Sequence, residues 1–145
     1  MNRVVVVEDE TMARKGIILT IDWSALGCVI VGEAANGEEG AALVERLSPD
    51  IVVTDVKMPR MDGVEMIAKL RENGCQAKFI ILTAYSDFKY AQMSIPLCRC
   101  RAVDPVHHIL IHAAAIICHG NAQHAVFLSR INADIAIIAA LKAMD

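Results

Sequence analysis

The sequence is poor in aromatic residues and has no hydrophobic run long enough to cross a membrane. Its 145 residues include one tryptophan, two tyrosines and three phenylalanines. The longest mostly apolar stretch runs from Ile109 to Cys118, whereas a membrane-spanning helix needs about 20 apolar residues. The apolar run after Arg3, Val4 to Val7, is also too short for the hydrophobic region of a signal peptide. These absences predict a cytoplasmic protein without a membrane partner.

The chain also lacks an excess of basic residues and a disulfide framework. It has 14 lysines and arginines against 17 aspartates and glutamates, for a formal net charge of -3. A nucleic-acid-binding surface would need basic residues gathered on one face. The five cysteines are odd in number and irregularly spaced, which favours reduced thiols. What the chain does have is 55% hydrophobic residues, enough for the core of a single domain spanning residues 1–145.

Short apolar runs alternate with stretches of helical spacing over the first 95 residues. The predicted strands are residues 4–7, 28–31, 51–54 and 79–82, and the predicted helices are residues 11–23, 38–47, 64–72 and about 86–95. In the second helix we expect Ala42, Leu43 and Leu47 to face inward. Strands that alternate with helices at these intervals indicate a doubly wound parallel α/β sheet.

Carboxylates stand where the predicted strands end. Glu8, Asp9 and Glu10 follow the first strand, and Asp55 follows the third. Ligands of an open α/β sheet bind outside the carboxyl ends of the strands, so we expect these side chains to converge there. Converging carboxylates repel one another unless a cation neutralises them, and Mg²⁺ is the natural hard cation for oxygen ligands. Glu33 follows the second strand and is less well placed if that strand lies at the sheet edge.

The position of Asp55 also suits phosphoryl chemistry. Aspartate is a covalent nucleophile in phosphoryl transfer. A cation beside it would neutralise the charge of an arriving phosphoryl group. Thr83 ends the fourth strand, where its hydroxyl would hydrogen-bond a phosphoryl oxygen and bias the loop that follows.

Motifs over residues 1 to about 95 resemble the receiver domain of two-component response regulators. They are Val7-Glu8-Asp9-Glu10, Val53 to Pro59, Met61-Asp62-Gly63 and Ile81 to Ala84. The resemblance implies a flavodoxin-like sheet with strand order 2-1-3-4-5. It implies that Asp55 is the phosphoacceptor for a sensor histidine kinase, and that Glu8 and Asp9 bind Mg²⁺ with it. The backbone carbonyl of Lys57 would be a further metal ligand, and Thr83 would be the switch hydroxyl.

Two more stretches narrow the resemblance. Ile21-Asp22-Trp23 and Thr83 to Phe88 resemble receivers that precede arabinose-regulator-like helix-turn-helix domains in bacterial transcription factors. Such an output domain does not fit into the rest of the chain, so DNA binding is expected only through a domain absent from it. The implied function is a phosphorelay switch of a transcriptional output, and not an enzyme, with a homodimer as one open arrangement.

Residues 96–145 depart from the family pattern. The family expects a phosphate-binding lysine, in a Lys-Pro pair, at the end of a fifth strand, but none stands near the expected position at about Pro105. That lysine is therefore unassigned. The segment is predicted to be mostly helical, at about residues 106–118 and 133–144, with an atypical or disrupted fifth strand and last helix. Real divergence and an altered reading frame or junction after about Ile95 both remain open.

Two other functions remain open. Without the lysine, the receiver scaffold would work as a phosphorylation-independent interaction or dimerisation module. A metal-dependent phosphohydrolase of similar architecture would also use a strand-end aspartate as nucleophile. That class typically has a second aspartate two residues later, where this chain has Lys57, which argues against it.

Overall fold

The computed structural model describes residues 1–83 and 114–118. Five strands of this part of the chain form one sheet in the order β2-β1-β3-β4-β5. The elements are β1 (Asn2–Val7), α1 (Thr11–Thr20), β2 (Cys28–Ala34), α2 (Gly37–Leu47), β3 (Ile51–Asp55), α3 (Gly63–Glu72), β4 (Lys78–Thr83) and β5 (Ala114–Cys118). The first four strands are parallel, and β5 pairs antiparallel with β4. The predicted flavodoxin-like fold is confirmed, with the parallel strand order 2-1-3-4. The fifth strand departs from the predicted parallel sheet, because it is antiparallel to β4.

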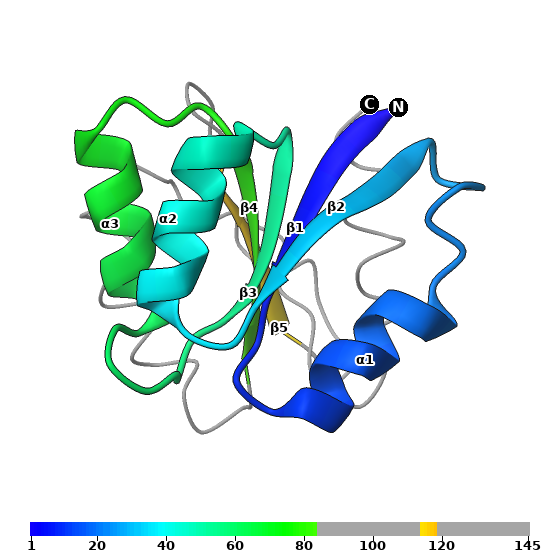
Figure 1. The fold of residues 1–145 in the computed structure, drawn as a ribbon, viewed down its shortest axis with the longest axis horizontal. Coiled ribbons are helices and arrows are strands. Elements are labelled where there is room, and N and C mark those ends of the chain that lie inside the picture. Colours follow the sequence, from blue (N-terminus) through cyan, green and yellow to red (C-terminus); the bar gives the residue numbers. More distant parts are fainter. Residues whose placement is uncertain (84–113, 119–145) are drawn as a thin grey trace, which may run out of the picture.

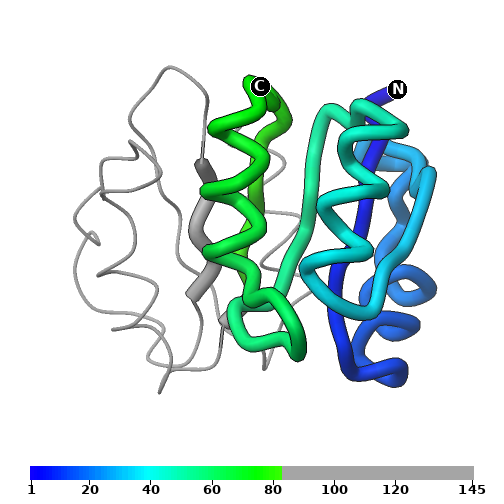
Figure 2. Tube along the Cα trace, turned by 60° about the vertical axis from the view of Figure 1, so that its left-hand side comes forward, coloured from blue at the N-terminus to red at the C-terminus, as the bar shows by residue number. Residues whose placement is uncertain are grey.

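Helices cover both faces of this sheet. α2 and α3 lie side by side on one face, and α1 lies on the other (Figure 1). The turned view brings α2 and α3 to the front, with the strands behind them (Figure 2). The right-handed crossover that joins parallel neighbours through a helix produces this arrangement.

The alternation of side chains along β1 divides the core into two clusters. Val5 and Val7 point toward α2 and α3, where they meet residues such as Met66. Val4 and Val6 point to the opposite face, toward the cluster that includes Ile17 of α1. All four valines are fully buried, as expected for a central strand of a parallel sheet.

Two predictions about the helices are wrong in detail. α1 ends at Thr20 rather than residue 23, because Ile21 is already extended and Trp23 turns back, its indole N–H donating to the Ile17 carbonyl at 3.2 Å. In α2, Ala42 is exposed rather than inward. The buried face of that helix is displaced by one residue and includes Ala41.

The prediction of a helix through residue 118 is also wrong, because residues 114–118 form β5. Its residues pair with β4 from Thr83 opposite Ala114 to Phe79 opposite Cys118. A short apolar run does not by itself distinguish a helix from a strand, and here pairing satisfies the edge of β4. The helices predicted at about residues 86–95 and 133–144, and the position near Pro105, lie outside the described residues.

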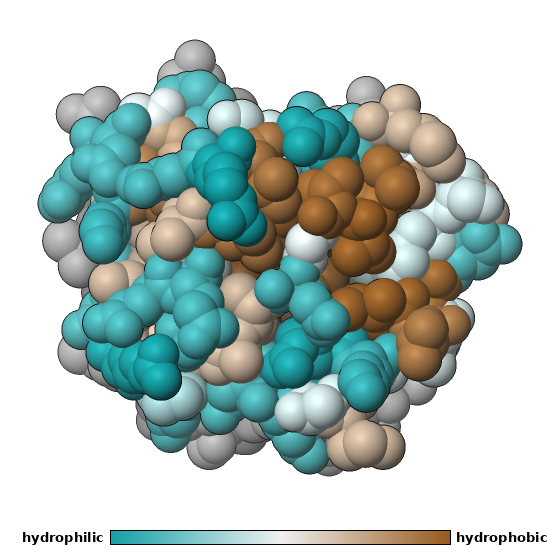
Figure 3. All heavy atoms as spheres, in the orientation of Figure 1, coloured by the Kyte–Doolittle hydropathy of each residue, from teal (hydrophilic) through white to brown (hydrophobic). Residues whose placement is uncertain are grey.

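The surface at the β2 edge of the sheet is partly apolar. Figure 3 shows hydrophobic residues gathered over β2 and the adjacent part of α1. Val29 of β2 and Leu19 of α1 are among the exposed large hydrophobic residues. Within the described residues, none of the helices combines the length and apolar character needed to span a membrane.

Candidate functional site

Three carboxylates meet at the carboxyl edge of the sheet. β1 and β3 are neighbouring parallel strands with Val7 opposite Thr54, so Glu8 and Asp55, the next residue of each, lie next to each other. One carboxylate oxygen from each of Glu8, Asp9 and Asp55 lies within 4.8 Å of the others. The predicted convergence of these three side chains is therefore present in the structure.

The three carboxylates differ in their access to solvent. Glu8 is 2% exposed and Asp55 is 7% exposed, whereas Asp9 is exposed. Two like charges held close together in a buried place destabilise each other, and a cation between them removes that repulsion. Three carboxylate oxygens with an opening to water fit a hard divalent ion such as Mg²⁺, which binds a few carboxylates and keeps several waters.

The Asp55 carboxylate is held by its own strand end. Its Oδ1 accepts a hydrogen bond from the backbone N–H of Val56 at 2.8 Å. Its backbone carbonyl accepts one from the buried hydroxyl of Thr54 at 3.0 Å. The first contact orients the Asp55 carboxylate, and the second holds the backbone at the end of β3.

The loop after Asp55 folds back tightly against it. The N–H of Gly63 donates to the carbonyl of Val56 at 2.8 Å, which closes the loop between β3 and α3. A methyl group at Gly63 would collide with the backbone carbonyl oxygen of Asp55. Asp62 caps α3 in a capping box with Glu65. The Met61-Asp62-Gly63 motif therefore starts the helix and also lets the loop pack closely against the backbone of Asp55.

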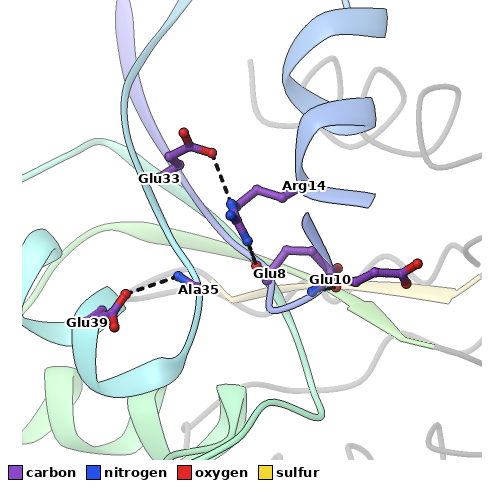
Figure 4. Close-up of polar contacts among 6 residues, drawn as sticks. All are labelled: Glu8, Glu10, Arg14, Glu33, Ala35 and Glu39. Atoms are coloured by element: carbon purple, nitrogen blue, oxygen red, sulfur yellow. Dashed lines mark hydrogen bonds and ion pairs between the residues drawn. The ribbon is translucent and has the colours of Figure 1, made fainter. Parts of the chain in front are cut away.

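An arginine of α1 connects the acidic edge to β2. The Nε of Arg14 lies 3.0 Å from Glu33 Oε2, and its Nη1 donates to the backbone carbonyl of Glu8 at 2.5 Å. Figure 4 shows the guanidinium between these two groups. Glu33 therefore pairs with Arg14 and is not part of the carboxylate cluster, in keeping with its place on the edge strand.

Glu39 lies on α2 and has a structural role at that helix start. Its carboxylate accepts a hydrogen bond from the N–H of Ala35 at 3.4 Å (Figure 4). The side chain of Asn36 caps the helix by accepting from the Glu39 N–H at 3.0 Å. Hydrogen bonding with Asn36, and then with Ala35, lowers the pKa of Glu39 below its usual 4.5.

The remaining predicted site residues are only partly described. Thr83 is the last residue of β4, and Leu82 before it pairs with Asp55, so the backbone of Thr83 reaches the same edge of the sheet. The side chain of Thr83 lies outside what the structure describes. The Lys57 side chain is exposed two residues beyond Asp55, and the role of its carbonyl stays a prediction. Arg14 was not among the predicted site residues.

Known proteins place the chain in a family. The response regulator receiver domain matches residues 4–103. The chain therefore belongs to the response regulator receiver family, and it has the acidic pocket expected of a receiver. This match confirms the family that its motifs indicated and extends eight residues beyond residue 95.

Two similar proteins are named as transcriptional regulators. The uncharacterized transcriptional regulatory protein YesN of Bacillus subtilis is 37% identical over 92 residues, which cover 63% of this chain and 25% of that protein. The transcriptional regulatory protein HptR of Staphylococcus aureus is 30% identical over 131 residues, which cover 90% of this chain and 46% of that protein. The chain spans a quarter to just under half of these relatives.

Solved structures give the same result. The REC domain of AraT, a response regulator from Geobacillus stearothermophilus, is 37% identical with a TM-score of 0.60, and the match covers 66% of this chain and 74% of that one. A CheX-CheY-BeF3-Mg²⁺ complex from Borrelia burgdorferi contains a chain that is 26% identical, with a TM-score of 0.57 and coverage of 66% and 72%.

Proposed function

We propose that Asp55 accepts a phosphoryl group from a sensor histidine kinase and that the modified domain switches a transcriptional output. The observation that carries the proposal is the convergence of Glu8, Asp9 and Asp55 within 4.8 Å at the carboxyl edge of the sheet. Membership in the receiver family supports the kinase as the donor. The names of YesN and HptR support transcription as the output.

The proposed step is an in-line transfer to the carboxylate. An Asp55 oxygen forms a bond to phosphorus while the bond between phosphorus and the donor histidine nitrogen breaks. The electron pair stays on the imidazole, which takes up a proton, and Asp55 becomes an acyl phosphate. The Val56 N–H that already binds Asp55 Oδ1 at 2.8 Å holds the carboxylate in place for the attack.

Glu8 and Asp9 supply the negative charge that would bind Mg²⁺ beside Asp55. Bound Mg²⁺ would neutralise the carboxylates and the phosphoryl oxygens as charge shifts between them. Its ligands would be Glu8, Asp9, Asp55 and the carbonyl of Lys57, and the Mg²⁺ named in the Borrelia complex supports this choice. Thr83 would hydrogen-bond a phosphoryl oxygen from the end of β4 and so bias the segment that follows.

The chain acts in this proposal as a signalling switch and not as a metabolic enzyme. Its partner is the kinase, and a homodimer would be one form of its response. DNA binding would belong to an output domain outside the 145 residues, since the chain spans only part of its relatives.

Intact mass spectrometry tests the proposal. We expect incubation with acetyl phosphate and Mg²⁺ to add one phosphoryl group, which base removes. Asp55→Ala should abolish the adduct, whereas Asp22→Asn, just beyond the C-terminal end of α1, should leave it unchanged. An adduct on Asp55→Ala would refute the assignment. No adduct on the wild type would favour the phosphorylation-independent interaction module.

A further inference from the structure

We propose that Arg14 is a positioning residue, which ties the backbone of Glu8 to β2 and so holds the acidic pocket in the geometry that binds a divalent cation. The inference rests on the proposed function of that pocket. It assigns a role in cation binding to a side chain that contributes no ligand atom itself.

The two contacts of Arg14 lead to different parts of the fold. Its Nη1 donates to the carbonyl oxygen of Glu8 at 2.5 Å, in the loop between β1 and α1. Its Nε bonds Glu33 Oε2 at 3.0 Å, close to the end of β2. One rigid guanidinium therefore joins the acidic loop, the first helix and the edge strand (Figure 4).

The carbonyl that Arg14 holds is the one most able to disturb the pocket. It belongs to the peptide group between Glu8 and Asp9, so its rotation turns the backbone of both metal-binding candidates. The other side of Glu8 is fixed by its N–H, which donates to the Ala34 carbonyl at 3.1 Å. The Glu8 side chain also accepts from the N–H of Glu10 at 3.3 Å. Arg14 thus adds a hydrogen bond at the Glu8 carbonyl to those at its N–H and its carboxylate.

Burial makes this contact more than a surface ion pair. The Arg14 side chain is 13% exposed, whereas that of Glu33 is 51% exposed. Of the two hydrogen bonds of Arg14, the one to the Glu8 carbonyl is therefore the better shielded from water. The bond to Glu33 orients the guanidinium. Groups that orient metal ligands in this way typically change metal affinity by about 10–100-fold when removed.

The positioning effect of Arg14 and the effect of its positive charge change cation binding in opposite directions, so an experiment can separate them. Deleting a positive charge near a cation site should by itself strengthen cation binding. If Arg14 positions Glu8, its deletion should instead weaken binding. Lys15, the exposed neighbour on α1, offers the matched control, because Lys15→Ala removes the same charge without touching the contact.

The experiment is calorimetric titration of the full chain with MgCl₂. We expect Arg14→Ala to raise the Kd for Mg²⁺ about tenfold and Arg14→Lys to recover only part of the loss. Lys15→Ala should leave the Kd unchanged or lower it. With acetyl phosphate, Arg14→Ala should need more Mg²⁺ but reach the wild-type maximal rate at saturation. Urea unfolding in EDTA should show that the variant is folded without the metal, which separates this result from a general loss of stability.

The outcomes separate this inference from the proposed function. If the wild type does not bind Mg²⁺, or Asp55→Asn binds it equally well, the function assigned to the pocket fails and this inference with it. If the wild type binds and Arg14→Ala matches it, only the positioning role is overturned. Should Arg14→Ala not fold, the charge-conserving Arg14→Lys variant decides: it keeps the positive charge but loses the rigid guanidinium, so we expect a raised Kd, and an unchanged Kd overturns the role.

Discussion

Replacing Asp55 by Asn should make the metal-free protein more stable, although it removes the central residue of the proposed site. The carboxylate oxygens of Glu8 and Asp55 lie within 4.8 Å of each other, and both side chains are buried. At that separation and an effective dielectric constant of about 20, two unit charges repel by about 3 kcal/mol. Asparagine removes the repulsion and still offers an oxygen to the Val56 N–H.

The expected net gain is smaller than the full repulsion, because water at the exposed Asp9 screens part of it. We expect Asp55→Asn to raise the free energy of unfolding by about 1–2 kcal/mol and the Tm by about 3–8 °C. The fluorescence of Trp23 follows unfolding well, since this single tryptophan is 6% exposed and packs in the core. The comparison belongs in EDTA, which keeps the pocket free of divalent cations.

Mg²⁺ should reverse the difference. A ligand that binds only the folded state raises stability by mass action, and the wild type retains all three carboxylates. Asp22→Asn is the matched control, because its Oδ1 accepts from the N–H of Ala25 at 3.0 Å and Asn keeps that bond. The electrostatic account of the pocket is wrong if Asp55→Asn is no more stable than the wild type in EDTA. It is also wrong if Mg²⁺ raises the stability of Asp55→Asn as much as that of the wild type.

Two other predictions concern the surroundings of the site. Gly63→Ala should lower the free energy of unfolding in urea by about 1–3 kcal/mol, because the added methyl group meets the backbone at the end of β3. Gly16→Ala, which meets nothing within 4 Å in α1, should instead raise it by about 0.5–1 kcal/mol; equal effects of the two would refute the close approach. Because the pKa of Glu39 is lowered in the folded state, its ionised carboxylate stabilises the fold. That contribution to the free energy of unfolding is complete above pH 4.5 and is lost as the pH falls through the lowered pKa. The difference in urea midpoint between the wild type and Glu39→Gln should therefore shrink as the pH falls below 4.5, and a constant difference would contradict this.

The fold and the acidic cluster were predictable because both follow from local patterns. The run Val4 to Val7 has no polar residue, which indicates a strand buried on both faces, and it is fully buried. Glu8 comes directly after this run, and Asp55 comes directly after the mostly apolar run Ile51 to Thr54. The carboxyl ends of parallel strands lie at the same edge of a sheet, so these two positions predicted the site once the family resemblance gave the strand order.

The features that the sequence did not reveal depend on contacts with the backbone or with small residues. The inward face of α2 includes Gly40, where an added methyl would lie 2.7 Å from the Met66 sulfur and 2.8 Å from Val7. Glycine has no hydrophobic signal, so the sequence pattern predicts an inward face that includes Ala42. Arg14 binds a carbonyl oxygen, which every residue carries, and no pattern of side chains indicates such a partner.

These contacts bear on how the domain would respond to phosphorylation. The metal side of the pocket stands on β1 and β3, and Glu8 is fixed through its N–H, its carbonyl and its carboxylate. That side has little freedom to move when charge arrives at Asp55. The proposed switch residue, Thr83, is instead the last residue of β4, on the other side of β3 from β1. We therefore expect the response to phosphorylation to begin with a movement of Thr83, while Glu8 and the backbone around it stay in place.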